Sequence, residues 1–177
     1  KMIEGAVGHI LKRHHGIENP TFQDIKKYYD ENLHPEKIDL NDQKVYENIF
    51  HKGKWAGIFQ FTENGAQKFC RKAKPRNIID VAAITSIYRP GPLGANVDKL
   101  YVRAKKSPGD ISYEHDDVKG LTEETYGFLI FQEQIALLAH KLGKDFSLDE
   151  GNKLRKLLTK KGTGEVEKQK NKLKLKF

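Results

Sequence analysis

The chain has 177 residues, of which 37% are hydrophobic and 32% charged, a composition that supports a folded domain and excludes a disordered chain. The single cysteine, Cys70, excludes an intrachain disulfide framework and a cysteine-rich zinc site. No apolar run approaches the roughly 20 residues of a membrane span, and the first residues lack the layout of a signal peptide. We therefore expect no membrane partner.

The formal net charge of +8 is unevenly distributed along the chain. Residues 68–106 contain ten basic and two acidic residues, a net of +8, and residues 153–177 contain the same numbers. Residues 107–152 contain three basic and ten acidic residues, a net of −7, while residues 1–67 are close to neutral. Two basic bands separated by an acidic band indicate a polyanionic partner.

Apolar spacing and capping residues predict a mainly α-helical fold with one or two short strands. In chain order, we expect helices over residues 3–15, 21–33, 42–52, 64–74, 77–88, 95–106, 128–142 and 147–158. The run 55–61 is β-like because it is apolar and rich in aromatic and branched residues. A forced turn is expected over 89–93, and residues 110–124 are expected to be mostly loop. Both ends stop inside patterned segments, so we expect a piece of a longer protein, truncated at both ends.

The strongest candidate binding feature is the basic run near the C-terminus. On a helix, Lys153, Lys156 and Lys160 form one cationic stripe, because they are spaced i, i+3, i+7. Arg155 adds a planar fork that can hold phosphate oxygens in two places, and Lys161 follows with a glycine-containing turn. This layout is typical of a site for a triphosphate or a nucleic-acid backbone. The alternative is a solvated basic helix face.

Two further motifs carry polar groups at the edges of apolar runs. Arg89 precedes a Pro-Gly-Pro turn that would hold its side chain at a defined place, although a plain interhelical turn is the alternative. Gln132, Glu133 and Gln134 interrupt an apolar run, so they belong either to a buried network or site, or to the solvent side of a helix.

Several catalytic and metal-binding motifs are missing from the sequence. It contains no Asp-x-Asp, no Gly-x-Ser-x-Gly and no Walker pattern. His9, His14 and His15 are not accompanied by cysteines or a carboxylate cluster, so we expect exposed helix histidines and no metal site. The residues show no self-contained catalytic constellation.

Four ordered motifs are similar to those of one polymerase family. They are Gly-Ile-Phe-Gln-Phe-Thr-Glu-Asn-Gly at 57–65, Ile-Tyr-Arg-Pro-Gly-Pro-Leu at 87–93, Thr-Tyr-Gly-Phe-Leu-Ile-Phe-Gln-Glu-Gln at 125–134 and Leu-Arg-Lys-Leu-Leu-Thr-Lys-Lys at 154–161. Together they resemble the fingers segment of the C-family replicative DNA polymerases, the α subunits of bacterial DNA polymerase III.

The resemblance implies a helical fingers subdomain at residues 42–177 and, at residues 1–41, a helical connection that follows the polymerase palm. Such enzymes join a deoxynucleoside triphosphate to a primer end with Mg²⁺ held by palm aspartates. Those aspartates are expected before Lys1, so the resemblance implies a fragment that is inactive alone and binds no Mg²⁺ itself.

The resemblance also implies a nucleotide-binding set. In the family, a pair of basic residues on a fingers helix contacts the incoming triphosphate, and this pair aligns with Arg155 and Lys156. Many relatives have Arg where this chain has Lys156, which keeps the charge but loses the bidentate fork. The whole expected set is Arg155, Lys156, Lys160, Lys161, Arg89 and Gln132.

The middle basic band is the candidate contact for the phosphates of primer-template DNA. Its expected contact residues are Lys68, Arg71, Lys72, Lys74, Arg76, Arg103, Lys105 and Lys106. The other implied partners are the palm and remaining fingers and, through the parent enzyme, a sliding clamp and replisome proteins. The implied compartment is the bacterial cytoplasm, or the host cytoplasm if the source is viral.

Two alternatives from other classes stay open at this point. The chain could be a standalone basic DNA-binding module without catalysis, which would bind DNA in a salt-dependent way with no contribution from nucleotide. It could also be a scaffold whose basic bands only solvate or bind an acidic protein.

Overall fold

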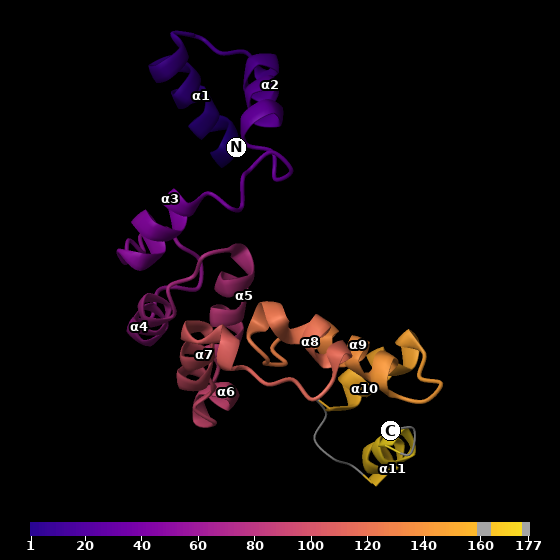
Figure 1. The fold of residues 1–177 in the computed structure, drawn as a ribbon. Coiled ribbons are helices and arrows are strands. Elements are labelled where there is room, and N and C mark those ends of the chain that lie inside the picture. The colour runs from indigo at the N-terminus through magenta and orange to yellow at the C-terminus, as the bar shows by residue number, and fades with distance from the viewer. Residues whose placement is uncertain (159–163, 175–177) are drawn as a thin grey trace. The chain divides into compact units, whose positions relative to one another are not determined.

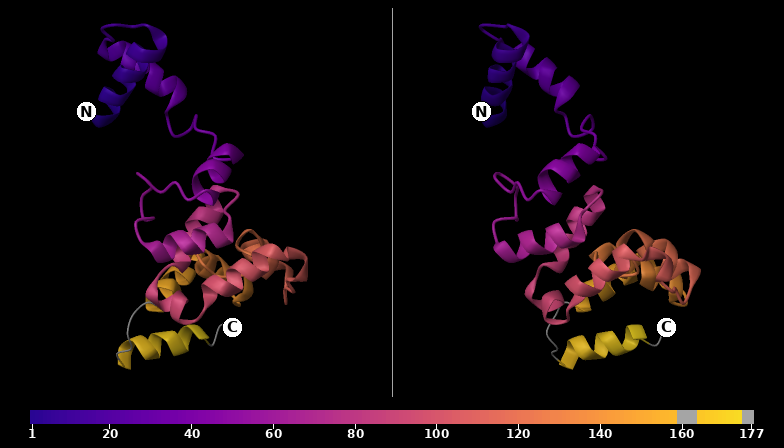
Figure 2. Two further views of the ribbon diagram at one scale, coloured as in Figure 1. Left: turned by 90° about the vertical axis from the view of Figure 1, so that its left-hand side faces the viewer. Right: turned by 60° about the vertical axis from the view of Figure 1, so that its left-hand side comes forward.

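A computed structural model describes residues 1–158 and 164–174 of the chain, and its regular structure is helical (Figure 1). The elements in order are α1 (Met2–His15), α2 (Phe22–Asn32), α3 (Gln43–Val45), the π-helix η1 (Tyr46–His51), α4 (Asn64–Ala73), α5 (Ile78–Ile87), α6 (Pro90–Gly94), α7 (Val97–Lys106), η2 (Pro108–Asp110), α8 (Asp116–Thr122), η3 (Glu123–Thr125), α9 (Gln132–Leu142), α10 (Leu148–Leu158) and α11 (Gly164–Lys174). The mainly α-helical fold is confirmed. Figure 2 shows the same elements from two further sides.

Residue contacts divide the chain into two units, Lys1–Asp42 and Gln43–Phe177. In the first unit, α1 and α2 pack together, with Val7 and Leu11 of α1 buried. The predicted capping box at the start of α2 is confirmed. The backbone N–H of Asp24 donates to Thr21 Oγ1 at 3.2 Å, and that of Thr21 donates to the Asp24 carboxylate at 2.8 Å.

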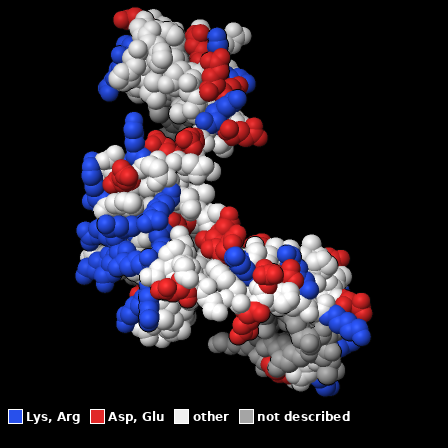
Figure 3. All heavy atoms as spheres, viewed as in Figure 1, with Lys and Arg blue, Asp and Glu red and all other residues white. Residues whose placement is uncertain are grey.

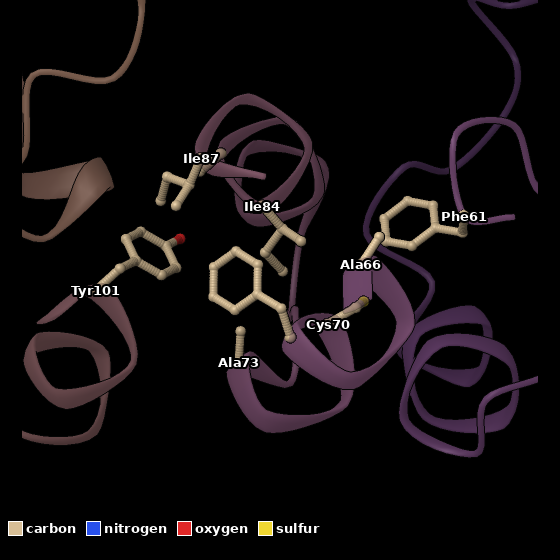
Figure 4. Packing of buried hydrophobic residues seen from close by; sticks show 9 residues of the cluster. Phe61, Ala66, Cys70, Ala73, Ile84, Ile87 and Tyr101 are labelled. Carbon is tan, nitrogen blue, oxygen red and sulfur yellow. The ribbon is translucent and has the colours of Figure 1, made fainter. Parts of the chain in front are cut away.

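The core of the second unit forms where α4, α5 and α7 meet (Figure 4). Helix α4 begins at Asn64, which is inside the helix and not its predicted cap, because Glu63 is the N-cap residue; Pro75 follows its end. Helix α5 lies between two prolines, and its N-terminus is capped by the Asn77 side chain, which accepts from the Asp80 N–H at 2.8 Å. The buried residues of this cluster are Phe61, Ala66, Phe69, Cys70, Ala73, Ala83, Ile84, Ile87 and Tyr101.

One carboxylate, Asp80, lies inside this apolar core and is completely buried. It accepts from the hydroxyls of Tyr101 at 3.1 Å and Tyr126 at 3.3 Å, from the Arg76 N–H at 2.8 Å, and from Lys105 Nζ. Lys105 is only 6% exposed, and its burial lowers the pKa of the ammonium, an effect that the Asp80 carboxylate opposes. The network therefore joins α5, α7 and the turn at Tyr126 through a satisfied buried charge pair.

The β-like run 55–61 is not a strand, and the described residues 1–158 and 164–174 contain none. Gly57 has φ 78° and Gln60 has φ 65°, left-handed conformations that reverse the chain. The reversal brings the rings of Trp55 and Phe61 together, with centroids 5.3 Å apart and planes at 9°. Aromatic packing on the core therefore replaces strand pairing.

Two other expected loops are partly helical. The Pro-Gly-Pro segment is the short helix α6, with Pro90 in its first turn, where a missing N–H costs no hydrogen bond. The acidic segment 110–124 includes α8, whose N-terminus is capped by the ring of His115, which accepts from the Asp117 N–H at 3.1 Å. Acidic side chains in the first turn of α8 favour the helix because they face its positive end.

Helices α9 and α10 pack closely against each other. A Cβ on Gly151 would lie 2.4 Å from the carbonyl oxygen of Ala136, so the backbones touch where α10 has no side chain. The predicted capping box of α10 is confirmed, because the Ser147 N–H and the Glu150 N–H each bond to the other residue's side chain, at 3.0 and 3.2 Å. This close contact fixes how residues one turn further along α10 meet α9.

Candidate functional site

Arg155 and Gln132, two residues of the expected nucleotide-binding set, meet in the structure. Gln132 is the first residue of α9 and is exposed, whereas Arg155 lies on α10 and is half-buried. A guanidinium N–H of Arg155 donates to Gln132 Oε1. This contact lies one turn from Gly151 and Ala136, so the close helix packing determines it.

The Arg155–Gln132 contact leaves the guanidinium able to bind an anion. A guanidinium has five N–H donors, and the amide oxygen of Gln132 takes only one of them in this structure. The amide holds the planar group in one orientation, which reduces the entropy lost when phosphate oxygens bind. The first turn of α9 adds a partial positive charge beside this group.

Gln134, two residues further along α9, has a structural role. It is buried, and its Oε1 accepts from the Ile130 and Phe131 N–H groups, each at 2.8 Å. Its Nε2 donates to the Leu121 carbonyl at 2.8 Å and to Thr125 Oγ1 at 2.9 Å. The sequence left open whether residues 132–134 belong to a buried network or to the solvent side of a helix, and both are found. Gln134 belongs to a buried network, whereas Gln132 and Glu133 are exposed.

The other basic residues of the C-terminal band can be placed only in part. Lys153 and Lys156 lie exposed on α10, whereas Leu157 on the same helix is buried. Lys156 adjoins Arg155 in sequence and contributes a second cation to the same end of α10. Lys160 and Lys161 lie outside the described residues.

Arg89 has a different environment from Arg155. It is exposed, precedes α6, and lines a pocket of about 460 Å³. The remaining lining residues are Gln60, Phe61, Thr62, Glu63, Ala66, Ile84, Thr85, Tyr88, Pro90 and Leu93. The pocket has the size of a small-molecule site, and its lining combines apolar and polar residues. No hydrogen bond in the described residues joins Arg89 to the Arg155–Gln132 pair.

Seven residues of the expected DNA-binding set are exposed, and one is not. The exposed residues are Lys68, Arg71, Lys72, Lys74, Arg76, Arg103 and Lys106, from α4, the α4–α5 connection and α7. Figure 3 shows basic side chains gathered over the part of the second unit where α4 and α7 lie. We call the seven exposed residues the basic face.

Lys105 differs from the other seven, because its ammonium is buried against Asp80 and cannot reach a phosphate. It is therefore a structural residue of the core and not part of the basic face. The sequence reasoning also missed Asp80. A lone carboxylate in the apolar run of α5 was a usable signal, since a buried charge requires a partner of opposite sign.

In residues 1–158 and 164–174, no three histidine, cysteine or carboxylate side chains gather closely enough to hold a metal ion. The same residues include no helix that is both long and apolar enough to cross a membrane.

Comparisons with known proteins agree with the resemblance found in the sequence. Residues 16–176 match the family described as "Bacterial DNA polymerase III alpha subunit finger domain". The chain is 33% identical over 151 residues to a DNA polymerase III subunit alpha of Halalkalibacterium halodurans, covering 82% of this chain and 13% of that protein. It is 33% identical over 157 residues to a DNA polymerase III subunit alpha of Staphylococcus aureus, covering 89% of this chain and 14% of that protein.

The chain is thus a finger domain of a polymerase subunit. More narrowly, it belongs to the bacterial DNA polymerase III alpha subunit finger-domain family. It spans about one seventh of the length of the curated relatives that it matches.

Proposed function

We propose that this chain is the part of a replicative DNA-directed DNA polymerase that binds the incoming deoxynucleoside triphosphate and contacts primer-template DNA. The parent protein would be a nucleotidyltransferase, and its palm and remaining fingers would be the direct neighbours of this segment. A sliding clamp and other replisome proteins would be partners through the parent. Family membership supports the polymerase role, and the Arg155–Gln132 contact is the single observation that carries the nucleotide role.

The proposed role of Arg155 follows from the charge of the substrate. A triphosphate carries about four negative charges, and its transfer depends mostly on positioning and charge neutralisation. Arg155 would hold two phosphate oxygens through its remaining donors while Gln132 keeps the group oriented. Lys156 would add a point charge beside it. Mg²⁺ in the parent would supply further charge neutralisation from palm residues outside this chain.

The pocket beside Arg89 supports a second contact with nucleotide. Arg89 lines a pocket whose apolar lining residues include Phe61 and Ile84. A cation beside apolar lining residues suits a molecule with one anionic and one aromatic part, which is the character of a nucleotide. We therefore retain Arg89 in the nucleotide-binding set.

The test uses the full-length polymerase that carries this segment. Arg155→Ala removes charge-assisted hydrogen bonds worth about 1.5–3 kcal/mol, so nucleotide kcat/KM should fall about tenfold to a hundredfold. The dissociation constant for primer-template DNA should change much less. Arg155→Lys should restore only part of the loss, since it lacks the fork. Lys141→Ala, on an exposed α9 side chain paired with Asp117, is the control and should be neutral. Equal losses in nucleotide use and DNA binding would contradict the nucleotide role.

The basic face also favours the second candidate, a DNA-binding module that needs no other part of a polymerase. Its seven cations are exposed on the same unit. The isolated chain would then bind duplex DNA with an affinity that falls steeply with salt and does not respond to added nucleotide. Binding that requires the remainder of the polymerase would exclude this candidate.

A further inference from the structure

The connection between η1 and α4 exposes one aromatic side chain, Phe59. The ring is 85% exposed, whereas Phe61, two residues later, is 2% exposed and belongs to the core. An exposed phenylalanine on a flexible loop would fold onto nearby apolar surface. The conformation of this connection therefore determines whether the Phe59 ring can pack on that surface.

The connection is held at both ends, which keeps the Phe59 ring outside. Trp55 and Phe61 stack on each other, and Phe61 also meets Phe50 with centroids 5.8 Å apart. The Phe61 carbonyl accepts from Gln67 Nε2 at 2.8 Å, and the Ile58 N–H donates to the Trp55 carbonyl at 3.0 Å. Because Phe61 occupies the core position, the reversed chain at 57–60 directs the Phe59 side chain outward.

The connection that contains Phe59 and the residues around its two ends include several cations. The side chains of Arg71 and Trp55 both approach Gly53, at the start of the connection. Gln60, which directly follows Phe59, lines the pocket that contains Arg89. Lys54 in the same connection is exposed, and Glu63 is the carboxylate in the pocket lining. An exposed aromatic ring on a connection with cations at its ends suits a nucleic-acid strand, because phosphates can meet the cations while a base covers the ring.

We propose that Phe59 stacks on an unpaired base of the template strand beyond the primer end. The inference rests on the proposed function, because it requires primer-template DNA at this part of the chain. Stacking is independent of sequence, so Phe59 would hold the strand without reading it. The neighbouring cations would neutralise the phosphates on either side of the stacked base.

The experiment measures binding of the full-length polymerase to primer-template DNA with a single-stranded template overhang. A matched DNA has abasic sites in place of the first overhang bases. Phe59→Ala should weaken binding to the base-bearing DNA by about tenfold, and should leave binding to the abasic DNA unchanged. Phe59→Tyr should bind as the wild type does, whereas Phe59→Leu should lose as much as Phe59→Ala.

Three outcomes would overturn the inference. They are equal losses on the two DNAs, no loss on either, and recovery by Phe59→Leu, which would indicate an apolar contact with another part of the polymerase. Circular dichroism should show an unchanged melting temperature for each variant, because the ring is exposed. If Arg155→Ala impairs nucleotide use while Phe59→Ala changes nothing, the stacking inference fails and the proposed function stands.

Discussion

Replacing Asp80 by Asn should destabilise the protein strongly, because it removes the only carboxylate that the structure shows bonded to the buried Lys105 ammonium. Asp80 is 0% exposed, and it accepts from Tyr101, Tyr126, Lys105 and the Arg76 backbone. Asn keeps the shape and one acceptor but removes the charge. An unpaired buried charge costs about 3–5 kcal/mol. That is a large part of the roughly 5–15 kcal/mol that stabilises a typical domain.

The measurement is urea unfolding of the 177-residue chain followed by circular dichroism, for the wild type and a double-mutant cycle. Lys105→Met alone should also destabilise, because it leaves Asp80 without its cation. The double variant with both changes should lose less than the sum of the single losses, with a coupling of about 1–3 kcal/mol. Lys106→Met is the matched control, since Lys106 is the exposed neighbour on α7, and its effect should stay within about 0.5 kcal/mol.

Either of two results would contradict a stabilising Asp80–Lys105 pair. A loss below about 1 kcal/mol for Asp80→Asn would mean that water or relaxation already solvates the ammonium in the wild type. Strictly additive single losses would mean that Asp80 and Lys105 contribute independently and not as a pair. An Asp80→Asn variant that fails to fold even without urea agrees with the predicted loss of stability. In that case Tyr101→Phe, which removes one hydroxyl donor to Asp80, should lower the free energy of unfolding by a smaller, measurable amount of about 1 kcal/mol.

The remaining predictions concern pH, the nucleotide site and salt. Burial raises the pKa of the Cys70 thiol from 9.0 to about 12, so between these values the folded state keeps a proton that the unfolded chain loses. The free energy of unfolding of the wild type should therefore fall between pH 9 and 12 relative to that of Cys70→Ala. Parallel pH profiles of the two proteins would contradict this. Gln132→Ala should raise the nucleotide KM severalfold in steady-state kinetics. The double variant with Arg155→Ala should be little worse than Arg155→Ala alone, because Gln132 acts through Arg155. Additive effects would indicate an independent contact of Gln132 with nucleotide. Replacing Lys68, Arg71 and Lys72 by Ala should reduce the steepness of the plot of log DNA-binding constant against log salt concentration by about 0.9 for each lost phosphate contact. Lys37→Ala, in the first unit, should leave that slope unchanged. An unchanged slope in the triple variant would show that the basic face does not contact DNA.

The sequence was sufficient where local interactions determine the structure. The capping boxes at Thr21 and Ser147 are contained within four residues, and α5 lies between two prolines that limit it. Local signals of this kind do not depend on the rest of the fold.

The misjudged features depend on partners far along the chain. A strand at 55–61 needs a neighbouring strand, and packing of Trp55 on Phe61 replaced it. Lys105 was assigned to DNA by its charge, yet Asp80, 25 residues earlier, holds it inside the core. The Arg155–Gln132 contact spans 23 residues and depends on helix packing that periodicity does not describe. The resemblance identified both residues, but only the structure shows that they meet.

The stacked pair in the connection at 55–61 also has an optical consequence. Trp55 is the only tryptophan in the sequence, so intrinsic emission from the isolated chain comes from a single indole. That indole stacks on Phe61 and, like the Arg71 side chain, approaches Gly53; Trp55 precedes the exposed Phe59 by four residues. Binding of a DNA strand to this connection would alter the emission of Trp55. The protein therefore has a built-in fluorophore at the place where the proposed template contact forms, and titrations there require no added dye.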